Sequence, residues 1–180
     1  MNVDPYAPQS GDANIAIDHY DLDLEYRLST NRLTGTATIT GRATAVTDAI
    51  SLDLVTLRVS KLQVAGDARA SFRQTDRKVR VSLSRPLAVD EAFELTVRYA
   101  GAPRPRRTRW GTLGWEELED GVIVASQPTG APTWFPCNDL PSDKATYRIA
   151  ITTDDGYTVS AGGAPTVTTV KGRRRWVFDR

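Results

Sequence analysis

The sequence is poor in the side chains that build a self-sufficient hydrolytic site. It contains one histidine, His19, and one cysteine, Cys137, among 180 residues. A zinc site needs three or four ligands at short spacing, and one histidine far from the only cysteine offers no Cys-His pair for nucleophilic catalysis. We therefore predict that this chain holds no metal and supplies no catalytic residue, and that Cys137 is a buried structural thiol.

The sequence also lacks an excess of charge and any long apolar run. Its 23 Lys and Arg residues nearly balance its 22 Asp and Glu residues, for a net charge of +1, which argues against nucleic acid or a membrane as a partner. No segment reaches the roughly 20 apolar residues that cross a bilayer, and the first residues do not resemble a signal peptide. A lone cysteine excludes an internal disulfide. We therefore expect a cytoplasmic protein.

What the sequence does contain is alternation of period two, the mark of half-buried β-strands. In the first such run the apolar side is formed by Tyr20, Leu22, Leu24 and Tyr26. Further strands are expected over residues 33–45, 50–54, 57–64, 71–74, 78–83, 93–99, 122–125, 145–151, 157–161, 167–170 and 175–178, whereas the Pro- and Arg-rich residues 101–109 cannot form a central strand. No helix of ten residues or more is expected. The pattern predicts a single all-β domain over residues 1–180, a saddle-like antiparallel β-sandwich with residues 1–13 as a loosely ordered lead-in.

Two clusters of charge each have a functional and a plain interpretation. Asp21, Asp23 and Glu25 share the other face of the first strand, but a spacing of about 7 Å is too wide for them to share a cation without further ligands, which favours a solvated face. Four arginines could contact phosphates: Arg104, Arg106, Arg107 and Arg109. The near-neutral chain and the single neighbouring aromatic, Trp110, favour an exposed loop instead.

The segment from Gln127 to Tyr147 is different in kind. It reads QPTGAPTWFPCNDLPSDKATY and mixes aromatic residues that prefer burial with four prolines that cannot donate to a sheet. Such a segment is a rigid, shaped loop on a scaffold, where binding residues concentrate. The neutral amide of Gln127 suits recognition of a peptide backbone or an amine. The alternative is a loop amide that satisfies its own backbone.

This segment resembles the signature of the aminopeptidase N family of zinc metallopeptidases, which includes leukotriene-A hydrolase. The shared elements are Gln127, eight intervening residues, Pro-Cys-x-Asp-x-Pro over residues 136–141, then Lys144 with Ala145 and an aromatic at Tyr147. The first two strands also fit, so that the resemblance covers nearly the whole chain. It implies a β-saddle N-terminal domain that packs on a thermolysin-like catalytic domain.

The resemblance also implies roles for individual residues. In the family, a Gln or Glu on this loop helps to hold the α-amine of the substrate and to wall its first side-chain pocket, and Gln127 matches that position. A second Gln, common two residues earlier in the family, is replaced by Ala125. The loop would be braced by Trp134, Phe135, Pro136, Cys137, Asp139 and Pro141, and Asp139 and Lys144 are expected to pair or to cap.

The parent protein implied by this resemblance is an aminopeptidase that releases N-terminal residues from peptides by zinc-activated water. The H-E-x-x-H and Gly-x-Met-Glu-Asn motifs of the family do not occur in this sequence, so the catalytic domain with its zinc is expected beyond residue 180. The partners would be that domain and a peptide substrate. An apolar surface is then expected beside the Gln127 loop, with Pro132, Trp134 or Leu140 as candidates. The alternative is a free-standing β-sandwich that binds a partner without catalysis.

We predict that the 180-residue chain, purified alone, binds no zinc stoichiometrically and does not hydrolyse an aminoacyl anilide, because it has no tight cluster of metal ligands. Elemental analysis and an assay with and without a chelator test this. Tightly held stoichiometric zinc, or hydrolysis that a chelator abolishes, would contradict it.

Overall fold

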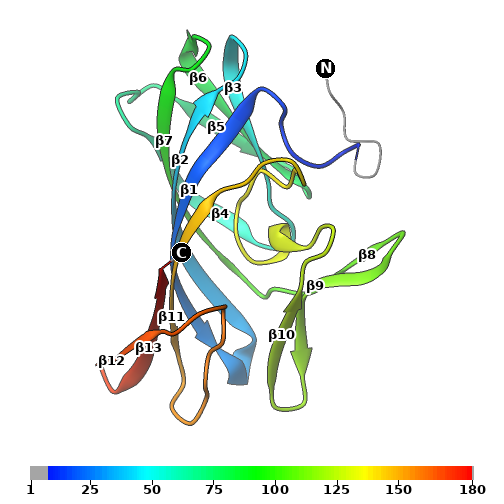
Figure 1. The fold of residues 1–180 in the computed structure, drawn as a ribbon, viewed down its shortest axis with the longest axis vertical. Coiled ribbons are helices and arrows are strands. Elements are labelled where there is room, and N and C mark those ends of the chain that lie inside the picture. The colour runs from blue at the N-terminus through cyan, green and yellow to red at the C-terminus, as the bar shows by residue number, and fades with distance from the viewer. Residues whose placement is uncertain (1–7, 180) are drawn as a thin grey trace.

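The computed structural model describes residues 8–179, and within them regular structure is almost entirely β (Figure 1). The only helices among these residues are two single turns of 3-10 helix, η1 (Leu28–Thr30) and η2 (Ala131–Thr133). Neither is long enough or apolar enough to cross a membrane. The prediction of an all-β domain without long helices is confirmed.

The largest element is a seven-stranded sheet that runs the length of the molecule (Figure 1). Its spatial order is β12 (Thr166–Val170), β13 (Arg173–Asp179), β11 (Thr146–Thr153), β1 (Ile15–Arg27), β2 (Arg32–Ala43), β7 (Ala92–Gly101) and β4 (Arg58–Val64). Neighbouring strands are antiparallel except β1 and β11, which are parallel. The predicted antiparallel architecture therefore holds except at this one pair.

Two three-stranded sheets accompany the large one. The first has the order β3 (Thr47–Asp53), β6 (Lys78–Leu87) and β5 (Ser71–Gln74), and the second has the order β10 (Gly121–Ala125), β9 (Gly111–Leu118) and β8 (Arg106–Thr108). Fully buried aliphatic side chains from the large sheet and from the β3–β6–β5 sheet join in one core, among them Leu22, Ile39, Leu95, Leu52 and Val81. Removing such side chains from water is the main force that holds the sheets together.

The alternation predicted for β1 and β2 is confirmed. Tyr20, Leu22, Leu24 and Tyr26 are at most 3% exposed. On the other face of β1 the acidic side chains lie in the open and pair with arginines of β11 and β13. Asp21 pairs with Arg148 at 2.8 Å, Asp23 with Arg175 at 2.7 Å, and Glu25 with Arg173. The acidic face therefore supports cross-strand pairing and holds no cluster of ligands for a cation.

Two departures from the predicted strands have a clear structural reason, and a third region agrees with its prediction. β9 was not predicted, because Gly111 and Gly114, both at positive φ, interrupt its alternation. Residues 157–161 were predicted as a strand but have irregular structure, and Tyr157 there donates a hydrogen bond to Asp120 at 2.9 Å. The Pro- and Arg-rich stretch contributes only the short edge strand β8, in agreement with its exclusion from the centre of a sheet.

One close contact inside the large sheet can be tested directly. Gly35 in β2 lies opposite Tyr99 in β7, and a Cβ on Gly35 would come within 2.4 Å of the tyrosine ring. We predict that Gly35→Ala lowers the free energy of unfolding by about 1–3 kcal/mol, because the ring has no space to move in a packed core. Urea unfolding measures this. Thr36→Ala, on the opposite face, is the control and should change stability by less than about 0.5 kcal/mol. Equal effects would show that the contact does not matter.

Candidate functional site

The loop from residue 126 to residue 145 joins the three sheets. It leaves β10, turns through η2 and enters β11 (Figure 1). Its backbone is paired with β3, where Asp53 and Cys137 exchange hydrogen bonds of 2.7 and 3.0 Å. Just beyond β3, the N–H of Val55 donates to the carbonyl of Pro132 at 2.8 Å. The N–H of Trp115 in β9 donates to the hydroxyl of Thr133 at 2.9 Å. Hydrogen bonds thus tie the loop to β3 and β9, which agrees with the prediction of a rigid loop held by a scaffold.

Aromatic rings fix the middle of this loop. Phe135 is 2% exposed and meets Tyr20 edge to face at a centroid distance of 5.3 Å, and Trp134 at 4.4 Å. Tyr147 in turn stacks on Tyr20 at 5.1 Å. Pro136 beside them is buried. Such pairs contribute beyond the area that they bury, so this part of the loop is anchored to the core.

A buried carboxylate holds the next part. Asp53 is 4% exposed, and its Oδ2 accepts from the N–H of Gly11 at 2.7 Å and from the N–H of Asp139 at 3.2 Å. Its Oδ1 lies 2.8 Å from Nζ of Lys78. Lys78 also donates to the carbonyl of Gly11 at 2.8 Å. A carboxylate can be buried at acceptable cost only with donors of this number and charge.

Asn138 makes the second connection. Its N–H donates to the hydroxyl of Tyr20 at 2.9 Å, its Oδ1 accepts from the N–H of Asp12 at 2.6 Å, and its Nδ2 donates to Asp143 at 2.7 Å. Asp143 also accepts from the N–H of Ile17 at 3.2 Å. Burial raises the pKa of Asp143 despite these donors. Asn138 and Asp143 thus form hydrogen bonds with the first half of β1 and with the segment before it.

The lead-in is therefore tighter than the sequence predicted. Gly11 and Asp12 are bound by Asp53, Lys78 and Asn138. A Cβ on Gly11 would come within 2.1 Å of the Leu140 side chain, so glycine permits the close approach of lead-in and loop. The remainder of the predicted lead-in, residues 1–7, lies outside the described residues.

The expected pairing of Asp139 with Lys144 is wrong. Asp139 accepts a hydrogen bond from the hydroxyl of Thr129, while Lys144 is exposed and makes no ion pair with it. Burial raises the pKa of Asp139. Burial also raises the pKa of the Cys137 thiol, which is 3% exposed. A neutral, enclosed thiol is a core residue and not a nucleophile.

Gln127 occupies the exposed tip of this otherwise fixed loop. It lies two residues beyond the end of β10, it is exposed, and its peptide bond with Pro128 is cis. Within residues 8–179 its side-chain amide has no hydrogen-bond partner. The alternative in which this amide satisfies its own backbone is therefore not what the structure shows, and its donors and acceptor face outward.

The apolar surface beside Gln127 differs from the one expected. Pro132 is buried, and Trp134 and Leu140 are only partly exposed. The exposed apolar side chains next to the loop come from β10 instead, where Ile123 and Val124 are 53% and 37% exposed. They belong to the strand that leads directly to Gln127.

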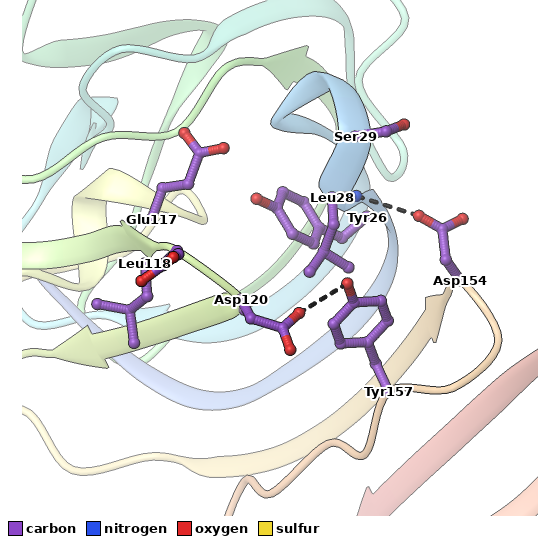
Figure 2. Close-up of a pocket in the computed structure, with 10 residues that line it drawn as sticks. Tyr26, Leu28, Ser29, Glu117, Leu118, Asp120, Asp154 and Tyr157 are labelled. Carbon is purple, nitrogen blue, oxygen red and sulfur yellow. Dashed lines mark hydrogen bonds between the residues drawn. The ribbon is translucent and has the colours of Figure 1, made fainter.

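A pocket that the sequence did not reveal lies at the tip of the β9–β10 hairpin, with a volume of about 460 Å³. Figure 2 shows carboxylates of the hairpin and of the turn after β11 gathered around Tyr26 and Tyr157. Its acidic residues are Glu117, Glu119, Asp120 and Asp154, and it has no basic residue. A groove of about 520 Å³ shares part of this lining and runs along β10 as far as Val124. Such a lining is complementary to a cation with an apolar body. Asp120 and Asp154 are 34 positions apart in sequence, which hid their proximity.

A resident metal does not fit the described part of the chain. No group of three or more His, Cys, Asp and Glu side chains in residues 8–179 is placed to hold one. His19 contacts the hydroxyl of Thr146 through Nδ1 at 2.7 Å. The donors around Asp53 already occupy its oxygens. Zinc chemistry would have to come from residues outside the described part of the chain.

Comparison with known proteins gives consistent matches. The family description "Peptidase M1 N-terminal domain" matches residues 16–179. Human glutamyl aminopeptidase is 30% identical in an alignment 155 residues long, and the match covers 77% of this chain and 16% of that protein. The pig glutamyl aminopeptidase is also 30% identical, over 149 residues, and this chain covers 16% of it.

Solved structures match the fold closely. An M1 zinc metallopeptidase mutant from Deinococcus radiodurans, bound to a Tyr-Ser-Ala substrate, aligns with a TM-score of 0.88 at 34% identity. A two-domain M1 zinc metallopeptidase mutant bound to L-arginine gives 0.88 at 33%. In both cases the match covers 96% of this chain and 40% of the other. The chain therefore spans less than half of each of these relatives.

The role of the Asp53 junction can be measured. We predict that Asp53→Asn lowers the free energy of unfolding by about 2–3 kcal/mol, because it leaves the Lys78 ammonium without its buried partner. The matched control is Asp21→Asn, which removes an equally short but solvent-exposed ion pair with Arg148 and should cost about 0–1 kcal/mol. Chemical denaturation of both variants provides the comparison. Indistinguishable losses would rule out Asp53 as a structural junction.

Proposed function

The chain belongs to the peptidase M1 N-terminal domain family, and we propose that it is the substrate-lining domain of a zinc-dependent aminopeptidase. The observation that carries this proposal is the position of Gln127. Its side chain is exposed and has no hydrogen-bond partner within residues 8–179. It lies on a loop whose later part is anchored by contacts of Phe135, Asn138 and Asp53. A fixed loop with a free polar tip is suited to contact a ligand without losing conformational entropy on binding.

In this proposal Gln127 contacts the amino terminus of a peptide. The amide oxygen accepts a hydrogen bond from the α-ammonium group, and the nearby loop walls the first side chain of the peptide. The Deinococcus relative, whose fold this chain shares, has a Tyr-Ser-Ala substrate bound. Ala125 provides no second amide two residues earlier, so amine recognition on this side depends on Gln127.

The same proposal divides the chemistry between two domains. The zinc ion of the parent enzyme would supply the activated water. Since residues 8–179 do not fit a metal site, the zinc would be held by a thermolysin-like catalytic domain. This chain would bind and orient the peptide and exclude water from one side of it. The exposed Ile123 and Val124 beside Gln127 would contact the catalytic domain or the peptide. A cytoplasmic location is part of the proposal and is compatible with the unpaired Cys137.

The test is Gln127→Ala in the full-length protein that the gene encodes. A hydrogen bond to a charged group is worth about 1.5–3 kcal/mol, so we expect kcat/KM for a peptide substrate to fall by about 10- to 150-fold. The melting temperature should stay unchanged, because the side chain holds no part of the core. Steady-state kinetics and a thermal melt measure the two effects.

Cys137→Ser is the contrasting variant. It places a hydroxyl in an enclosed apolar position and should cost about 1–3 kcal/mol of stability, with turnover preserved in the molecules that remain folded. If Cys137→Ser abolished turnover without a change in stability while Gln127→Ala had no effect on kcat/KM, the roles assigned to the two residues would be reversed. If the full-length protein had no peptidase activity at all, the alternative of a free-standing binding module would replace the proposal.

A further inference from the structure

Four arginines border one pocket next to the loop. The pocket has a volume of about 370 Å³ and lies where β8 and the turn after it approach the lead-in. Its basic residues are Arg106, Arg107 and Arg109 from this segment and Arg77 from the turn between β5 and β6. The other described residues of the lining are Pro8, Gln9, Ser10, Thr108, Trp110 and Thr129, and none of the lining residues within the range 8–179 is acidic. The sequence predicted an exposed loop here and did not reveal its convergence with Arg77.

Two of these arginine side chains form no ion pair within the described residues. On the outer face of the large sheet, Arg148, Arg173 and Arg175 each pair with a carboxylate. By contrast, the side chains of Arg106 and Arg107, whose backbones pair with β9, form neither a hydrogen bond nor an ion pair with another residue in the range 8–179. The Nε of Arg106 is moreover buried without a partner. Burying a charged donor without a partner is costly, so this nitrogen is suited to an acceptor from outside the chain.

The remaining charges around the pocket do not compensate these two. Asp139 is the acidic group that acts on Arg106, but it already accepts from the hydroxyl of Thr129 and forms no ion pair with the arginine. Arg77 is bonded to the neutral Gln9. Arg109 lies 4.4 Å above the ring of Trp110. Among the described residues, the side chains of Arg106 and Arg107 therefore bring positive charge to the pocket without an ion-paired carboxylate, although the chain as a whole is nearly neutral.

We propose that this pocket binds an oxyanion, the carboxylate or phosphate group of a small ligand. A guanidinium presents a planar fork of N–H donors that matches two oxygens of a carboxylate or phosphate. Arg106 and Arg107 supply this fork, and Arg77 adds long-range attraction. The pocket borders Thr129, two residues beyond Gln127, but the proposal stands on the arginines alone and holds whether or not the parent protein is a peptidase.

Isothermal titration of the protein that the gene encodes tests this. The probes are inorganic phosphate and glutarate, a dicarboxylate, in a buffer of low ionic strength free of other phosphates and carboxylates. Glutaramide, which has nearly the same shape without charge, is the neutral control and should not bind. We expect saturable binding of at least one anion with one site per chain, weakened by added salt. The tighter of the two anions identifies which oxyanion the pocket prefers.

Substitutions localise the binding. Arg106→Gln and Arg107→Gln should each weaken the affinity by about tenfold, the loss of a charge-assisted contact, and Arg106→Lys should restore only part of it because lysine lacks the fork. The matched control is Arg104→Gln, which removes the same charge two residues away from a side chain outside this lining and should leave the affinity within about twofold. The proposal is overturned if neither anion binds saturably, if glutaramide binds equally well, or if Arg104→Gln weakens binding as much as Arg106→Gln does.

Discussion

The carboxylate of Asp53 joins parts of the chain that are distant in sequence. It accepts from Gly11 in the lead-in and from Asp139 in the loop, and it pairs with Lys78 in β6, while its own backbone is bonded to Cys137. A buried carboxylate that loses its donors costs several kcal/mol. Any displacement of the loop or the lead-in would remove some of these donors, so the charge itself keeps both segments in one place.

Different residues of the loop anchor it to the core and are available to contact a ligand. Most of the unusual residues in the loop face inward, where Phe135 packs on Tyr20 and Asn138 bonds to the hydroxyl of the same tyrosine. Gln127 is exposed. The inward residues make the position of Gln127 independent of the ligand, which lowers the entropic cost of binding. A variant of Gln127 is therefore expected to change affinity or turnover. A variant of a buried loop residue such as Phe135 or Asn138 is expected to change stability.

The sequence predicted well what depends on local pattern. The alternation in β1 and β2 determined which side chains are buried, and the motif was sufficient to identify the family. Long-range relations could not be predicted in this way. The parallel pairing of β1 with β11 joins residues more than 120 positions apart, and residues 157–161 are irregular although their pattern suits a strand. Within the site, the motif marked the loop, but its partner Asp53 and the true partner of Asp139, Thr129, carry no local signal.

The distribution of charged side chains in the fold is another property that the sequence total did not reveal. The net charge of +1 argues against polyanions as general partners, but it does not describe how the charges are distributed. The fold nevertheless concentrates four acidic side chains in one pocket at the β9–β10 hairpin and four arginines in another. The groove that adjoins the first pocket reaches Val124, before Gln127 in the chain, and the second pocket includes Thr129, after it. Because electrostatic interactions are screened within about 10 Å at ordinary ionic strength, a ligand at either pocket responds to the local cluster and not to the total. A nearly neutral chain can therefore carry local clusters of opposite charge in different pockets.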